Sequence, residues 1–229
     1  MAVDSHAALT ITAFDWVPDF ARGFVRDLRP RWACEEIGLP YAIRLISARE
    51  RPGWYYDDQP WGQVPVVEAD GRILFESGAI LLHLGEKDDR LLPRDPAARD
   101  RVICWLFAAF NSVEPWAIEQ ANVSIFARDE EWARLRRPGL ARETGQRLDR
   151  LQTALGDRDW LAGTFSIADI AMITVLREFE RTPMLGDRQV LAAYVERGMA
   201  RPAFRAAMAA QLADFDGANA PQATARSSQ

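Results

Sequence analysis

The chain has 229 residues, 48% of them hydrophobic, which is enough apolar material for one large domain or two modest ones. Its formal net charge of -5 argues against a nucleic-acid partner or an anionic membrane, because both favour a basic protein face. The sequence predicts neither a membrane-spanning helix nor a signal peptide. Its only cysteines, Cys34 and Cys104, suggest neither a disulfide framework nor a metal site, so we expect a reducing cytoplasm.

Strand and helix patterns alternate in the first part of the chain. Helical patterns run up to Ile37, where Gly38 is a stop signal, and over residues 76–87. Short strands are expected at residues 9–14, 41–46, 64–69 and 72–75, and the last two are joined by an Asp70-Gly71 turn. This order predicts an α/β domain over residues 1–86.

A charged, proline-bearing segment follows Lys87, and the patterns beyond it are helical. Long helices are expected over residues 96–126 and 130–155, the second interrupted near Pro138, and shorter ones begin near Ser166, Arg188 and Pro202. The sequence therefore predicts an all-helical domain over residues 94–214. Residues 215–229 lack large apolar side chains beyond their first residue and are expected to form a disordered tail.

A pair of motifs is the sharpest local signal. Gln63-Val64-Pro65-Val66 opens the third strand, and Glu76-Ser77 follows at the start of a helix. In this arrangement the chain resembles the soluble glutathione S-transferase superfamily, whose members carry a cis proline, a strand hairpin and an E/Q-S pair in the same order. The resemblance covers nearly the whole chain. It implies a thioredoxin-like α/β N-terminal domain, an all-α C-terminal domain, glutathione as co-substrate, and a homodimer with its site where the domains meet.

The chemistry of these residues suits glutathione. A cis bond at Pro65 leaves the Val64 backbone free to pair with an extended peptide. Ser77 at a helix N-terminus suits the γ-glutamyl carboxylate, and the Glu76 side chain suits the α-ammonium group. The alternative is that Glu76-Ser77 only caps a helix and Pro65 only starts a strand. The glycyl carboxylate also needs partners, for which the preceding loop offers Arg49, Arg51, Gln59 and Gln63.

The catalytic position departs from the family. Family members place a Ser, Tyr or Cys just after the first strand, whereas this chain has none between Phe14 and Cys34. Lowering the pKa of a thiol needs hydrogen-bond donors or positive charge near the sulfur. Helix-start N–H groups and three side chains are the candidates, Arg22 as first choice, Trp16 as second, and Arg26. Each is weighed against a purely structural role, and Cys34 is expected to be a buried structural thiol.

A transferase needs an apolar pocket for its second substrate, facing the sulfur from the helical domain. Several aromatic residues lie along the predicted helix over residues 96–126, and Asn111 and Trp116 are the preferred substrate contacts. The resemblance implies attack of the glutathione thiolate on an electrophilic, hydrophobic substrate. Two alternatives stay open: another glutathione-dependent enzyme on this fold, such as an isomerase, ether-cleaving lyase, dehalogenase or peroxidase, and a non-catalytic glutathione-binding module.

Overall fold

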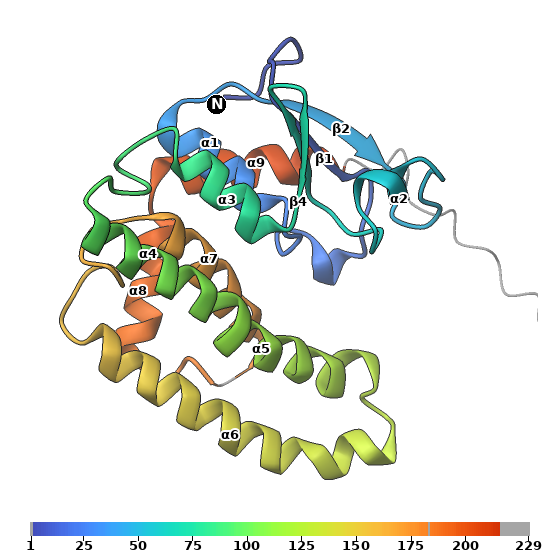
Figure 1. Cartoon of the computed structure of the whole chain (residues 1–229). Coiled ribbons are helices and arrows are strands. Elements are labelled where there is room, and N and C mark those ends of the chain that lie inside the picture. Colours follow the sequence, from blue (N-terminus) through green and yellow to red (C-terminus); the bar gives the residue numbers. More distant parts are fainter. Residues whose placement is uncertain (1, 183, 216–229) are drawn as a thin grey trace, which may run out of the picture.

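A computed structural model of the chain describes residues 2–182 and 184–215 (Figure 1). The tail expected over residues 215–229 lies outside the described residues, except for Phe215. That side chain is 2% exposed, so the packed chain extends one residue further than the sequence predicts.

The first part of the chain forms a small sheet with three helices. Its elements are β1 (Thr10–Phe14), α1 (Leu28–Ile37), β2 (Ala42–Ile46), α2 (Tyr55–Asp58), β3 (Val66–Ala69), β4 (Arg72–Phe75) and α3 (Ser77–Gly85). The strand order is β2-β1-β3-β4, with β1 parallel to β2 and antiparallel to β3. Asp70 and Gly71 join β3 to β4, and both have positive φ, which is the geometry that the Asp-Gly turn signal predicts.

Helix α1 ends where the sequence indicates. Gly38 adopts the left-handed conformation with φ of 68°, and its N–H donates to the carbonyl of Cys34. Before the helix, the segment after β1 contains only a short 3-10 turn (Asp19–Ala21) and then a turn at residues 23–27. The connection between β1 and α1 therefore spans residues 15–27.

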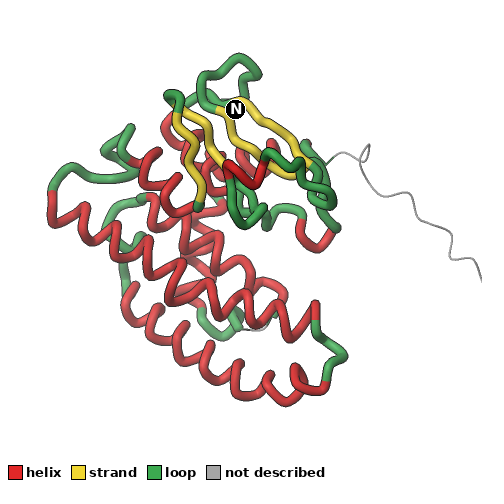
Figure 2. The backbone as a smooth tube through the Cα atoms, turned by 45° about the vertical axis from the view of Figure 1, so that its right-hand side comes forward, coloured by secondary structure: helices red, strands yellow, loops and turns green. Residues whose placement is uncertain are grey.

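The second part is helical (Figure 2). Its elements are α4 (Pro96–Ala108), α5 (Glu114–Ala121), α6 (Glu131–Leu155), α7 (Ile167–Arg177), α8 (Gln189–Met199) and α9 (Pro202–Ala213), with a 3-10 turn at Glu178–Arg181. Two π-helical segments, Ala109–Val113 and Asn122–Phe126, make one continuous rod with α4 and α5. The first has a clear cause: Pro115 has no N–H to donate to the carbonyl of Asn111, and the Glu114 N–H donates five residues back to Ala109.

Helix α6 differs from the sequence prediction at Pro138. The sequence predicts a break near Pro138, but the helix runs unbroken through it. Contacts on both sides of the proline hold this part of the helix in place: the Arg136 guanidinium pairs with Glu119 of α5, Arg137 donates to the Val123 carbonyl, and Leu140 packs in a cluster with Val123. Tertiary contacts here outweigh the one hydrogen bond that a proline removes.

The two parts share one hydrophobic core. Buried residues of the sheet, such as Ile11 and Val67, belong to the same cluster as Leu106 of α4 and Ile173 of α7. Helix α1 packs against both α3 and α9, so the last described helix lies beside the first (Figure 1). The α/β part followed by an all-helical part confirms the predicted fold class. Within residues 2–182 and 184–215, no helix combines the length and the apolar character that a membrane span requires.

Candidate functional site

A long cleft runs between the sheet and the helical part. It consists of a cavity of about 460 Å³ at the start of α3 and a cavity of about 430 Å³ next to β1. The two share four lining residues: Arg26, Gln63, Val64 and Glu114. Because these residues belong to both cavities, a single extended ligand can occupy the cleft across them.

The first cavity is built on the N-terminus of α3. Glu76 precedes the helix with φ of 66° and ψ of 116°, a backbone conformation that costs a non-glycine residue of order 1–3 kcal/mol and is characteristic of functional sites. Ser77 begins the helix and is 5% exposed. Both residues line the cavity, as the sequence motif predicts. The helix N-terminus here presents N–H groups and positive dipole charge, which suit an anionic group.

The Val64-Pro65 segment forms one wall of the same cavity. The peptide bond between these residues is cis, which confirms that prediction. No hydrogen bond joins the backbone N–H or C=O of Val64 to any described residue. Val64 and Pro65 therefore offer an open backbone edge to a peptide-like ligand.

Gln59 and Gln63 also line the first cavity. Gln59 is 2% exposed, and its Oε1 accepts a hydrogen bond from the Trp61 N–H at 2.7 Å, which leaves its amide N–H₂ group for a ligand. The Gln63 carbonyl accepts from the Tyr55 hydroxyl at 2.7 Å, so this loop is held in place by a buried tyrosine.

Arg51 lies in the second cavity instead. Its Nε donates to the Gly62 carbonyl at 2.7 Å and its Nη1 to the Ala48 carbonyl, while its guanidinium stacks 4.9 Å from the centre of the Phe14 ring. These contacts leave Nη2 as the part of the side chain that can meet a ligand.

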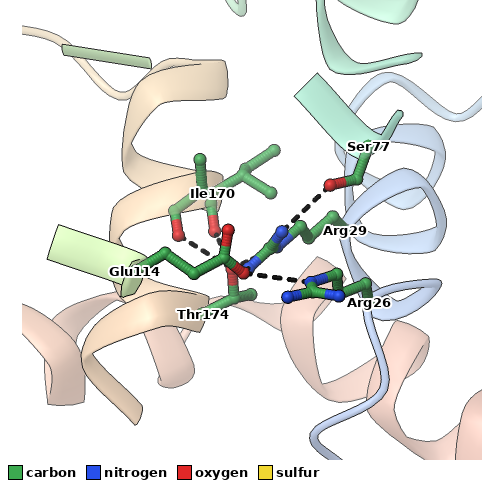
Figure 3. A network of polar contacts seen from close by, with 7 residues as sticks. Arg26, Arg29, Ser77, Glu114, Ile170 and Thr174 are labelled. Carbon is green, nitrogen blue, oxygen red and sulfur yellow. Dashed lines mark hydrogen bonds and ion pairs between the residues drawn. The ribbon is translucent and has the colours of Figure 1, made fainter. Parts of the chain in front are cut away.

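A network of polar contacts connects three residues that line the cleft, Arg26, Ser77 and Glu114, to the buried Arg29 (Figure 3). The buried Arg29 guanidinium donates to three groups: Ser77 Oγ at 2.9 Å, Thr174 Oγ1 at 2.9 Å and Glu114 Oε1 at 2.8 Å. Arg26 Nε donates to the same Glu114 oxygen at 3.0 Å. Arg29 thereby links the start of α3 to the helical part, and Glu114 links Arg29 to Arg26.

Glu114 is ionised in this setting. Burial raises the pKa of its carboxyl group, but the Arg29 and Arg26 guanidiniums oppose burial strongly enough to hold the pKa below its usual range. Glu114 is therefore a carboxylate shared by two guanidiniums, and Glu178 is a second acidic side chain that lines the cavity next to β1. Arg26 is the more exposed of the two cations, with 35% of its side chain accessible against 4% for Arg29.

Arg22 and Trp16, the first two choices for stabilising the thiolate, do not line the cleft. Arg22 Nε is 3.3 Å from Asp19 Oδ1, and the Trp16 ring stacks under the Arg49 guanidinium at 5.0 Å. Neither side chain lines the cavities found among the described residues. The structure instead brings Arg26, the third side chain considered, to both cavities of the cleft, which Val64 also lines.

The two expected substrate contacts, Asn111 and Trp116, lie in different surroundings. Asn111 lines the first cavity, in the π-helical segment before α5. Trp116 packs against a cluster of Val123, Ala133 and Leu140, with the Arg147 guanidinium 4.7 Å from its ring centre.

An apolar cavity of about 330 Å³ adjoins the second cavity and shares Phe24 and Phe126 with it. Phe20 also lines it, and the Phe20 and Phe126 rings meet edge to face at 5.9 Å, from the loop after β1 and the end of the helical rod. Sequence reasoning did not find this cavity. It also missed Glu114 and Arg29, for which the only local signals are an acidic residue before Pro115 and a basic residue before Pro30.

Parts of the chain are similar to a known protein family and to curated proteins. The family described as glutathione S-transferase, N-terminal domain, matches residues 28–87. Glutathione S-transferase tcpG of Claviceps purpurea is 33% identical over 95 residues, which cover 35% of this chain and 38% of that protein. The chain spans between 36% and 56% of the length of the first curated relatives it matches.

Solved structures match over a greater length. A glutathione transferase from Pseudomonas putida, with one glutathione disulfide bound per subunit, is 24% identical with a TM-score of 0.77, over 90% of this chain and 93% of that chain. A glutathione transferase from Burkholderia graminis, with two glutathione molecules bound per subunit, is 25% identical with a TM-score of 0.76, over 87% of each chain.

Proposed function

Because the chain belongs to the soluble glutathione S-transferase superfamily, we propose that it binds glutathione in the cleft and transfers the glutathione thiolate to an electrophilic, hydrophobic substrate. One observation carries this proposal. The cleft joins a site for a charged amino-acid end, an open backbone edge, a guanidinium and an apolar cavity, in that spatial order. Glutathione needs the first three, and a hydrophobic electrophile needs the last.

The γ-glutamyl end fits the first cavity. Its carboxylate would accept from the Ser77 hydroxyl and the free N–H groups at the start of α3, and its ammonium group would pair with Glu76. The cysteinyl residue would pair with the Val64 backbone in the manner of an added strand. Gln59, Gln63 and Arg51 are the candidates for the remainder of the peptide, including its glycyl carboxylate.

Arg26 is the proposed partner of the sulfur, in place of Arg22 and Trp16. It lies at the junction of the two cavities beside Val64, and a guanidinium stays charged at any working pH. A fixed positive charge lowers the pKa of a nearby thiol, so the proton leaves to solvent and the thiolate remains. The thiolate then attacks an electrophilic carbon; a C–S bond forms while the bond to the leaving group breaks or the π bond of an acceptor opens.

The second substrate would bind in the apolar cavity between Phe20, Phe24 and Phe126. Asn111 borders the first cavity and is proposed as a polar contact at its rim. Trp116 is not proposed as a substrate contact; its proposed role is to pack against the helical rod and support it. We extend the proposal to a cytoplasmic homodimer, in keeping with the family and with two unpaired cysteines.

The test uses the purified full chain with glutathione. Calorimetry should detect binding, the ultraviolet spectrum of the complex should contain a thiolate band, and a panel of electrophiles should yield at least one glutathione thioether, identified by its mass. Binding without a thiolate band would favour the non-catalytic module. A thiolate band with a reduced or isomerised product, and no thioether, would favour one of the other glutathione-dependent enzymes.

A further inference from the structure

The turn that carries Arg26 is held from outside by the helical part of the chain. Residues 23–27 lie between the 3-10 turn and α1, and no sheet ladder supports them. Two of their carbonyl groups accept from buried side chains far away in sequence. The Gly23 carbonyl accepts from Arg177 Nη1 at 2.8 Å, and the Val25 carbonyl accepts from Gln211 Nε2 at 3.0 Å. Arg177 belongs to α7 and Gln211 to α9.

Gln211 is fully buried, and its orientation is fixed by what it faces. Its Nε2 donates to the Val25 carbonyl and also to Asp27 Oδ1 at 2.8 Å. Its Oε1 is buried with no hydrogen-bond partner among the described residues. A flipped amide would place that oxygen against two acceptors, so the N–H₂ group must point at the turn. The side chain therefore contributes through its two donors.

Further contacts hold Asp27 and Phe24, which lie on either side of Val25. Asp27 Oδ2 accepts from Arg31 Nε at 2.8 Å, and Arg31 pairs in turn with Asp214 just after α9. On the other side of the turn, the Arg177 guanidinium lies 4.7 Å from the centre of the Phe24 ring. The residues on either side of Arg26 are thus fixed by charged or amide groups that are almost completely buried.

Burying these polar groups has a free-energy cost, which is justified if the position of the turn is important for function. Burying an amide and a guanidinium costs free energy, and an apolar contact of similar volume often stabilises a fold equally well. What these groups provide is direction, because each hydrogen bond fixes where one carbonyl of the turn lies. Arg26 directly follows the second of the two clamped carbonyls and precedes the clamped Asp27.

We propose that Gln211 and Arg177 are positioning residues, which hold the turn at residues 23–27 so that the Arg26 guanidinium faces the sulfur beside Val64. The inference rests on the proposed function, in which Arg26 stabilises the thiolate. Loss of either clamp should let the turn shift away from the sulfur while the γ-glutamyl anchor at Ser77 stays in place.

The experiment measures the thiolate absorbance of the glutathione complex against pH, together with glutathione affinity and conjugation rate. Gln211→Met keeps the approximate volume and removes both donors, and Arg177→Lys keeps a buried cation but loses the guanidinium geometry. We expect both variants to raise the apparent pKa of the bound thiol and to lower kcat by about 10- to 100-fold, as displacement of a catalytic group by about 1 Å does. Affinity at a pH below thiol ionisation should change little.

Tyr194→Phe is the matched control. It removes a buried hydrogen bond to Asp169 Oδ1 in the same helical part, so it reports a general loss of stability. Its pH profile should equal that of the parent protein. Arg26→Gln separates the two proposals, since it tests the sulfur partner directly.

Each outcome decides the matter. The pH profile of thiolate absorbance separates the two proposals. If Arg26→Gln shifts this profile while Gln211→Met and Arg177→Lys leave it unchanged, the positioning role is wrong and the proposed function stands. If Arg26→Gln keeps the parent profile, the sulfur assignment is wrong and the positioning role falls with it. Should Gln211→Met fail to fold, Arg177→Lys decides alone, and an equal shift in Tyr194→Phe would overturn the inference.

Discussion

Glu114→Gln removes the carboxylate that two guanidiniums share. In the parent protein Arg29 Nη2 and Arg26 Nε donate to Glu114 Oε1 at 2.8 and 3.0 Å. Glutamine keeps the volume and one acceptor oxygen, but it takes away the carboxylate charge that is hydrogen-bonded to the buried Arg29 guanidinium. Removing one partner of a buried pair costs about 3 to 5 kcal/mol, and the retained acceptor places this variant near the lower end, at about 3 kcal/mol. The Arg26 contact adds little, because that side chain is 35% exposed.

The effect should depend on pH. Burial raises the pKa of Glu114, but Arg29 and Arg26 lower it by more, so the folded-state pKa lies below the unfolded value of about 4.3. A carboxyl group with a lowered pKa stabilises the folded state above the unfolded pKa, and this contribution disappears as the pH falls through the folded-state pKa. The difference between parent and variant should therefore be full at neutral pH and shrink below about pH 4.

Urea unfolding at several pH values measures both effects as free energies. Glu143→Gln is the control, because its contact with Arg136 at 3.0 Å involves side chains 41% and 33% exposed. It should change the free energy of unfolding by less than about 1 kcal/mol. A Glu114→Gln protein as stable as the parent at neutral pH would refute the reasoning, since the charges would then not be coupled through the fold.

Three further outcomes are expected. Ser77→Ala should weaken glutathione binding by about 1 to 3 kcal/mol, the cost of a lost hydrogen bond to a charged group, and unchanged affinity in calorimetry would remove Ser77 from the site. Burial raises the pKa of the Cys34 thiol to about 12, so in the native protein a maleimide should modify exposed Cys104 and leave Cys34 intact; native labelling of Cys34 in a peptide digest would contradict this. Gly198→Ala should lower the free energy of unfolding by about 1 to 3 kcal/mol through overpacking, because its Cβ would lie 2.3 Å from Ile173 Cδ1, and Ile173→Ala should relieve the loss in the double variant; strict additivity would argue against that clash.

Features with local causes could be predicted from the sequence. Gly38 ends α1 because a left-handed residue is needed there, and Ser166 with Asp169 forms the capping box that begins α7. The Val64-Pro65 and Glu76-Ser77 motifs fall at one cavity because the short β3-β4 hairpin between them fixes their separation.

Features that depend on distant contacts could not be predicted. Glu114 meets Arg29 across 85 positions, and nothing in either segment indicates the other. The break expected at Pro138 is absent for the same reason, since contacts with α5 and the segment after it hold α6 as one continuous helix. Trp116 shows the limit of helical spacing, because the π-helical segment before it changes which side of the rod each residue faces.

The packing of α9 on α1 has a consequence for how the protein is made. The ring of Trp32 in α1 meets the ring of Phe204 in α9 edge to face, with the ring centres 4.9 Å apart, and Glu36 pairs with Arg201. When α1 leaves the ribosome, these partners have not been synthesised. At about 5 to 20 residues per second, completing the chain through α9 takes roughly 9 to 35 s after α1 is translated. During that interval the face of α1 that carries Trp32 is uncovered, so the nascent N-terminal half exposes an apolar surface that a chaperone can recognise. The packing of the α/β part is therefore completed only when α9 has been synthesised.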